Sequence, residues 1–273
     1  MKRAILLGAT GAVISALMLA SGFLAGQSQR AVAEDSQTTP MAAASGENLS
    51  RKDVENIIRD YLLANPELLL EVQQALDAKQ KEEQKIAQLG TITDNKEKIF
   101  RSANDGIVGN PNGKVTVVEF FDYNCGFCKR AIEDMQALTA ADPELRFVLK
   151  EFPILGPDSQ KASVVSMAFH KMMPEKYAEF HTQLLGGHGR AGEAQAIKIA
   201  ISLGADEAKL REAMKDPAIT DIFNETYDLA NKLAISGTPS YVVGNEVVFG
   251  AQGQDVLNEK LVAARAACAT ASC

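Results

Sequence analysis

Residues 115–135 have the sequence VTVVEFFDYNCGFCKRAIEDM, and this stretch decides the fold. It begins with an apolar run typical of a buried strand and ends with a run of helical spacing. Cys125 and Cys128 lie where the two runs meet, with two residues between them. A cysteine pair of this spacing at a strand-to-helix junction predicts a reversible dithiol/disulfide centre.

Cys125 is predicted to be the nucleophile of this pair. It falls at the N-terminus of the expected helix, where unpaired backbone N–H groups and the helix dipole stabilise a thiolate. Cys128 lies one turn further along the helix and is predicted to resolve a mixed disulfide. The alternatives are inert buried thiols or a structural zinc site. Zinc requires four ligands, and the other two cysteines, Cys268 and Cys273, lie at the extreme C-terminus.

The first 33 residues have the pattern of a secretory signal. Lys2 and Arg3 precede a mostly apolar run over residues 4–26, and Ala31-Val32-Ala33 offers a small-x-small cleavage site. Because the apolar run is long, an uncleaved membrane anchor is the alternative. In either case we expect export to the periplasm, an oxidising compartment in which a cysteine pair can carry out disulfide chemistry.

Composition argues against nucleic acid as a partner. Residues 1–33 hold three basic residues and no acid, so the remainder has 25 bases and 35 acids, a net charge of −10. Such a surface repels phosphates. The 273 residues, 46% of them hydrophobic, suffice for one full core and an appended module.

The predicted module precedes the cysteine pair and is helical. Residues 34–49 are small and polar, and we expect a flexible leader there. Residues 50–104 form a predicted association segment, in which Ser50 and Asp53 have capping-box spacing and Asn65-Pro66-Glu67 starts a second helix that ends near residue 89. That helix carries an apolar stripe, formed by Leu69, Val72, Leu76 and Ile86. The stripe packs either on its own domain or on other copies of the chain, and the charged stretch 79–85 favours self-association through residues 50–89.

Residues 105–273 are predicted to form an α/β catalytic domain. A strand over 114–121, a helix over 125–140 and a parallel strand over 145–151 make a β-α-β unit. A helical insertion follows at about 158–235. Strands over 240–243 and 246–249 then flank the hairpin turn Gly244-Asn245, and a last helix covers 254–267.

This order of elements resembles the thioredoxin fold of the DsbA family over about residues 110–267. Residues 120–128, FFDYNCGFC, resemble the family's active-site segment, and residues 237–241, GTPSY, resemble its cis-proline loop. Residues 50–89 resemble the N-terminal segment of the ScsC-like, copper-sensitivity suppressor branch, where it serves oligomerisation. The resemblance implies a thioredoxin fold with a helical insertion, preceded by an α-helical oligomerisation segment.

The resemblance also assigns roles to residues around the cysteines. Pro239 would be cis and lie against Cys125, so that the backbone of Thr238 can hold an extended substrate; an ordinary trans proline is the alternative. The implied substrate-binding residues are Thr238, Gly126, Phe127 and Tyr241.

Glu119 is the implied general base for Cys128. It lies in an apolar strand and is therefore either buried, with a raised pKa, or a surface acid. Lys150 is either its partner or solvated. The three histidines, His170, His181 and His188, lack metal-ligand spacing and are expected to be packed or solvated.

The sequence thus predicts an exported thiol-disulfide oxidoreductase, with the cysteines of exported client proteins as substrate and a membrane redox partner. It needs no organic cofactor beyond Cys125 and Cys128. The association segment favours isomerase or reductase over oxidase. The alternative is a copper-tolerance protein in which the pair ligates Cu(I), a soft ion; the scattered methionines are better suited to the core. Cys268 and Cys273 are expected to form a C-terminal disulfide, with free or intermolecular thiols as the alternative.

Overall fold

A computed structural model describes residues 49–270, without the side chains of 268–270. The predicted signal, nearly all of the leader and the predicted Cys268–Cys273 disulfide lie outside this description. The chain divides into two units between Arg59 and Asp60. Within residues 49–270, no helix combines the length and apolar character needed to span a membrane.

The first helix, α1 (Arg51–Ala64), begins at the predicted capping box. The Ser50 N–H donates to Asp53 Oδ2 at 3.0 Å, and the Asp53 N–H donates to Ser50 Oγ at 3.2 Å. These hydrogen bonds satisfy N–H groups that the first helical turn leaves unpaired and hold the pKa of Asp53 below its usual range. The predicted capping box of Ser50 and Asp53 is confirmed.

The second helix, α2 (Glu67–Asp94), runs five residues beyond its predicted end. Asn65 does not cap it, because the Asn65 side-chain amide instead donates to the Tyr61 carbonyl at the end of α1. Gln88 and Ile92, in the last turns of α2, are buried, and Gln88 Nε2 donates to the Leu233 carbonyl at 2.7 Å. The last turns of α2, which belong to the predicted association segment 50–104, are therefore part of the domain core.

Within the described part of the chain, five strands form one mixed sheet in the order β1-β3-β2-β4-β5. The predicted β-α-β unit is confirmed as β2 (Val115–Phe121), α4 (Gly126–Ala141) and β3 (Leu145–Glu151), with β2 and β3 parallel. The predicted hairpin is β4 (Ser240–Val243) and β5 (Glu246–Phe249), and its first turn residue, Gly244, has a φ of 57° that favours glycine.

Strand β1 (Gly106–Gly109), antiparallel to β3, was not expected from the sequence. It is short and begins at Gly106, where a Cβ atom would lie 1.7 Å from the Tyr177 ring. Glycine is therefore required for the strand to pass this ring.

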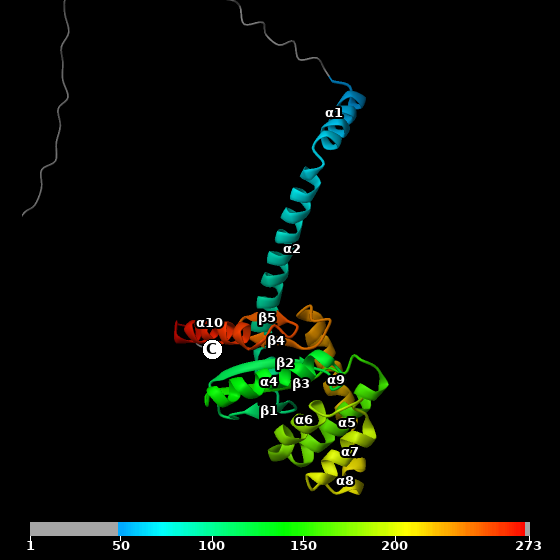
Figure 1. Cartoon of the computed structure of the whole chain (residues 1–273), viewed down its shortest axis with the longest axis vertical. Coiled ribbons are helices and arrows are strands. Elements are labelled where there is room, and N and C mark those ends of the chain that lie inside the picture. The colour runs from blue at the N-terminus through cyan, green and yellow to red at the C-terminus, as the bar shows by residue number, and fades with distance from the viewer. Residues whose placement is uncertain (1–48, 271–273) are drawn as a thin grey trace, which may run out of the picture. The chain divides into compact units, whose positions relative to one another are not determined.

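Each face of the sheet covers its own apolar cluster. One face, with Val117, Phe121 and Leu149, packs against α4, the insertion helices and α10 (Gln254–Thr270). The other face, with Val118 and Phe120, packs against the end of α2, the short helix α3 (Lys96–Phe100) and α9. The insertion helices α5 to α8 gather beside the sheet (Figure 1). The insertion contains α5 (Pro157–Met172), a 3-10 turn (Pro174–Lys176), α6 (Tyr177–Leu185), α7 (Glu193–Ser202), α8 (Glu207–Ala213) and α9 (Ala218–Lys232).

Lys150 is neither solvated nor the partner of Glu119, so both expectations are wrong. Side chains alternate between the faces of a strand, and Lys150 lies on the face opposite to Glu119. Its side chain is 2% exposed and donates to Asp105 Oδ2 at 2.6 Å and to the Lys98 carbonyl at 2.7 Å. Burial raises the pKa of Asp105 to about 6, although the neighbouring lysine charge opposes that rise.

We expect Lys150→Met to lower the free energy of unfolding by about 3–5 kcal/mol at pH 8, because it leaves the Asp105 carboxylate buried without a partner. The loss is expected to be smaller at pH 5, where this carboxyl takes up a proton in the folded state. Urea denaturation at both pH values measures the two losses. Lys114→Met, which breaks an exposed pair with Glu144, is the control and should change stability little. Equal losses at both pH values would contradict the role given to Asp105.

Candidate active site

Cys125 lies at the N-terminus of α4, beside the loop that leads into β4. Its backbone is extended (φ −76°, ψ 117°), and the helix begins at the next residue. The thiol is 6% exposed and lies 3.1 Å from the carbonyl oxygen of Thr238, to which it donates. The Thr238–Pro239 bond is cis, as the resemblance implied.

The two thiols have opposite acidities. Hydrogen bonding from the Cys128 thiol, which is the largest cause, and from the backbone N–H groups of Phe127 and Cys128 lowers the pKa of Cys125 to about 5, against the opposing effect of burial. Burial raises the pKa of Cys128 well above its usual range, and the nearby Cys125 and Glu119 raise it further. At neutral pH the pair therefore holds one thiolate, on Cys125, and one thiol.

Glu119 is buried beneath the cysteines. It is 1% exposed, so the surface-acid alternative is wrong. Burial, followed by the charge of Cys125, raises its pKa to about 8. A carboxyl with a pKa near neutrality therefore lies close to both thiols.

Tyr241 lies opposite Glu119 in the β2–β4 register and is 2% exposed. The prediction that it contacts substrate is wrong, because this face of β4 packs into the core together with Val243. Burial and the charge of Glu119 raise the pKa of Tyr241. Tyr241 therefore belongs to the wall around Glu119.

A groove of about 390 Å³ runs beside the cysteines. Its lining includes Phe127, Gly237, Thr238, Pro239, Phe249 and Gln252. Phe127 is 58% exposed, and the Arg130 guanidinium lies 4.4 Å from the centre of its ring. A Cβ atom on Gly126 would find only Arg130 Nη1, at 3.9 Å, so the surface there is open. The groove offers an apolar ring and the backbone of the Thr238 loop next to Cys125.

The histidines are not gathered at the site. His181 is fully buried against the Phe121 and Tyr123 rings, and burial lowers its pKa to about 3. His170 is partly buried against Tyr177, and His188 is exposed. Among the described residues, no three His, Cys, Asp or Glu side chains are grouped as a metal site would require.

Sequence reasoning assigned no role to Asp122 and Asn124, the polar residues that lie between β2 and the nucleophile. In the structure both take part in a hydrogen-bonded network with Ser159 of α5. The available signal was their position, because Asp and Asn that follow a buried strand favour turns closed by their own side chains.

Residues 116–262, more than half of the chain, match the DSBA-like thioredoxin domain. The chain belongs to this family, and the thioredoxin fold with a helical insertion is confirmed. Residues 51–83 match the N-terminal domain of the copper resistance protein ScsC. The predicted ScsC-like helical segment ahead of the DsbA-like domain is therefore confirmed as well.

Solved structures agree with this assignment. A thioredoxin-like oxidoreductase from Silicibacter pomeroyi is 40% identical, with a TM-score of 0.60, over 63% of this chain and 98% of that one. Salmonella enterica Typhimurium BcfH is 27% identical, with a TM-score of 0.68, over 78% and 95%. Proteus mirabilis ScsC in a transitional conformation is 26% identical, with a TM-score of 0.59, over 79% and 96%.

The first curated relatives are much longer than this chain. The Na(+)/H(+) antiporter NhaA 3 of Salinispora tropica is 25% identical over 162 residues, which are 59% of this chain and 24% of the antiporter. The chain thus spans about a quarter of the length of that relative.

We expect Cys128→Ala to raise the pKa of Cys125 from about 5 toward the unperturbed value of about 8.5, because it removes the thiol that contributes most to stabilising the thiolate. Cys128→Ser keeps a donor and should retain most of the depression. Ultraviolet thiolate absorbance against pH, with Cys268 and Cys273 replaced by serine, measures both. If alanine and serine give the same midpoint, the hydrogen bond from Cys128 is not the cause.

Proposed function

We propose that this member of the DSBA-like family is an exported, periplasmic thiol-disulfide oxidoreductase that acts on the cysteines of other exported proteins. One observation carries the proposal. The Cys125 thiol, with its pKa lowered to about 5, lies at a helix N-terminus against the Thr238 carbonyl, and Cys128 lies buried behind it. A stabilised thiolate backed by a second thiol is suited to disulfide exchange.

The proposed reaction proceeds in two exchanges. The Cys125 thiolate attacks one sulfur of a client disulfide, so that an S–S bond forms to Cys125 and the other client sulfur leaves as a thiolate. Once Cys125 is bonded to the client, it no longer carries the charge that helps to hold a proton on Glu119. The carboxylate form of Glu119 then takes the proton of Cys128, and Cys128 attacks Cys125, which releases the first client sulfur. The client is reduced and the Cys125–Cys128 pair is oxidised; the reverse sequence oxidises a client. The pair itself carries the electrons, so the proposal includes no organic cofactor, and a membrane redox partner resets the pair.

Client binding is assigned to the groove beside the cysteines. Thr238 precedes β4, and its backbone at the groove can pair with an extended client segment, while the exposed Phe127 ring offers an apolar contact. This arrangement suits unfolded or misfolded clients, whose backbone is available for pairing.

Self-association is the second part of the proposal. The stripe residues Leu69, Val72, Leu76 and Ile86 are 46–63% exposed, so the chain itself leaves them uncovered. This exposed stripe is the observation that supports self-association. Several catalytic domains gathered around one client would favour isomerisation or reduction over simple oxidation, because a released client thiolate can attack a second disulfide nearby.

Copper(I) binding by Cys125 and Cys128 is the alternative proposal. Its support is the adjacent pair of sulfurs and the match of residues 51–83 to a domain named for copper resistance. Titration of the reduced protein with Cu(I) against a chelator of known affinity, with Cys128→Ser as the control, tests it.

We expect Cys128→Ser to accumulate mixed disulfides with exported proteins, because the resolving attack is lost. Non-reducing gels of periplasmic extracts, followed by mass spectrometry, identify the adducts. The double variant Cys125→Ser, Cys128→Ser is the control and should give none. If the single variant also gives none, the proposed enzymatic role loses its support.

We expect the double variant Leu69→Asp, Leu76→Asp to be monomeric, because it places charge on the stripe. Light scattering of residues 34–273 measures the assembly, and a scrambled-substrate assay should show loss of isomerisation with dithiol oxidation kept. The double variant Gln74→Asp, Ala78→Asp adds the same two charges on the opposite side of α2 and is the control. An unmutated protein that is already monomeric would contradict the assembly proposal.

A further inference from the structure

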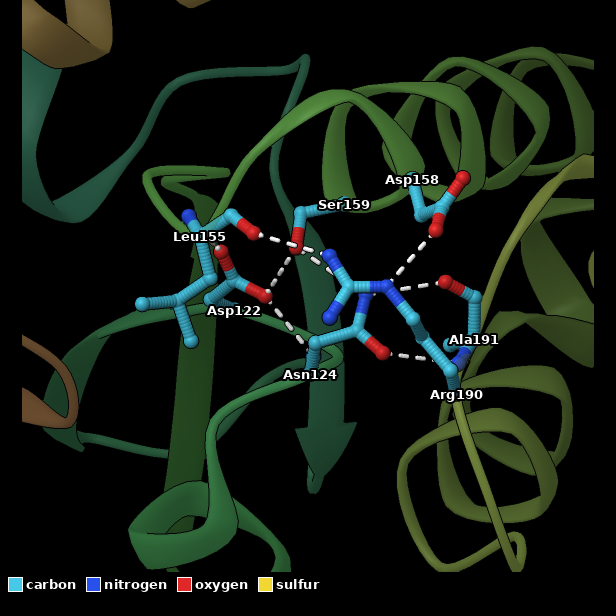
Figure 2. Close-up of polar contacts among 7 residues, drawn as sticks. All are labelled: Asp122, Asn124, Leu155, Asp158, Ser159, Arg190 and Ala191. Carbon is cyan, nitrogen blue, oxygen red and sulfur yellow. Dashed lines mark hydrogen bonds and ion pairs between the residues drawn. The ribbon is translucent and has the colours of Figure 1, made fainter.

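The residue before the nucleophile is bound to the helical insertion by its side chain (Figure 2). Asn124 Oδ1 accepts a hydrogen bond from the Ala191 N–H at 2.7 Å, and Asn124 Nδ2 donates to the Ala191 carbonyl at 2.8 Å. The same Nδ2 donates to Ser159 Oγ at 3.0 Å. One carboxamide thus pairs both backbone groups of Ala191, as a neighbouring strand would.

Asp122 fixes the other end of the same turn. Its carboxylate is fully buried and accepts from the Asn124 N–H at 2.7 Å, from Ser159 Oγ at 2.7 Å and from the Leu155 N–H at 2.9 Å. Its carbonyl oxygen accepts from the Cys125 N–H at 3.0 Å. The turn that delivers Cys125 is therefore held by groups of the insertion as well as by its own backbone.

The contacts that stabilise the Cys125 thiolate depend on its position. They are hydrogen bonds from Cys128, from the Thr238 side chain and from N–H groups of the first turn of α4. Hydrogen bonds weaken steeply with distance and angle. We propose that Asn124 is a positioning residue, which uses Ala191 of the helical insertion to hold Cys125 over the first turn of α4. The inference rests on Cys125 being the nucleophile of the proposed function.

Other contacts also attach the loop that contains Ala191, so attachment of the loop alone does not explain the Asn124 carboxamide. Arg190 forms an ion pair with Asp158 at 2.6 Å, and Lys129 donates to the carbonyl oxygens of Gly187 and Gly189 at 2.9 and 3.0 Å. These contacts hold the same loop without touching the turn before Cys125. A variant that breaks one of these contacts weakens the attachment of the loop but leaves Asn124 in place. The two roles can therefore be tested separately.

The test compares Asn124→Leu, Ser159→Ala and Arg190→Ala in the full chain, with Cys268 and Cys273 replaced by serine. Asn124→Leu keeps the size of the side chain and removes its hydrogen bonds. Ser159→Ala removes one partner of Asn124 and one of Asp122. Arg190→Ala removes the ion pair in the same loop and leaves the carboxamide in place. The readout is the pH dependence of Cys125 alkylation by iodoacetamide in the reduced protein, with circular dichroism to establish folding.

We expect Asn124→Leu to raise the pKa of Cys125 by about one unit, on the order of one weakened hydrogen bond to a charged group. The thiolate fraction at pH 5, and with it the alkylation rate, would fall about fivefold. Ser159→Ala should shift the pKa in the same direction by less, and Arg190→Ala should leave it unchanged.

An unchanged pKa in folded Asn124→Leu would overturn the inference, as would an equal shift in Arg190→Ala. If Asn124→Leu does not fold, Ser159→Ala decides, and an unchanged pKa there overturns the inference. Alkylation reports the acidity of Cys125 whether or not the protein acts on clients. Failure of this inference is therefore distinguishable from failure of the proposed function.

Discussion

The candidate site depends on one junction, at which the Cys125 sulfur lies 3.1 Å from the Thr238 carbonyl oxygen. The two residues are 113 positions apart and come from the start of α4 and the loop before β4. The sheet brings them together because β2, which leads to the cysteines, pairs directly with β4. The parallel β-α-β unit and the pairing of β2 with β4 together set this junction. The junction places Cys125 at the N-terminus of α4 and beside the groove lined by Thr238 and Pro239.

Local sequence patterns were enough to predict the β-α-β unit and the hairpin, because each depends on neighbouring residues. The partners of buried polar groups were not predictable in this way. Lys150 pairs with Asp105, 45 positions earlier, and that pairing depends on the unexpected strand β1. The prediction that Tyr241 contacts substrate was wrong for a related reason. Whether an alternating strand residue faces the core or the surface is decided by which helices cover that side of the sheet.

Two buried acids lie on the same face of neighbouring strands, Glu119 on β2 and Glu151 on β3. Burial raises the pKa of Glu151 to about 7, although hydroxyls of Ser163, Ser166 and Tyr177 hydrogen-bond to it. Glu119 has a pKa of about 8. Both values exceed the 4.5 of a free glutamate, so the folded state holds extra protons between pH 4.5 and 8. The contribution of these two groups to stability is therefore present below pH 4.5 and is lost as pH rises through 7 and 8.

The proposed self-association can be judged by the apolar surface available. The four stripe residues of α2 are about half exposed, and full burial of such a side chain is worth about 1.5–3 kcal/mol. Completing their burial would contribute about 3–6 kcal/mol per chain, or about 6–12 kcal/mol for a pair, against an association cost of about 4–15 kcal/mol. A stripe on α2 alone is therefore marginal for a pair of chains. The helix α1 carries further exposed apolar residues, Ile57, Ile58 and Tyr61, which roughly double the surface that association can bury. Burial of apolar residues from both α1 and α2 would bring the gain above most of this cost, which agrees with a matched family segment that begins in α1 and ends within α2.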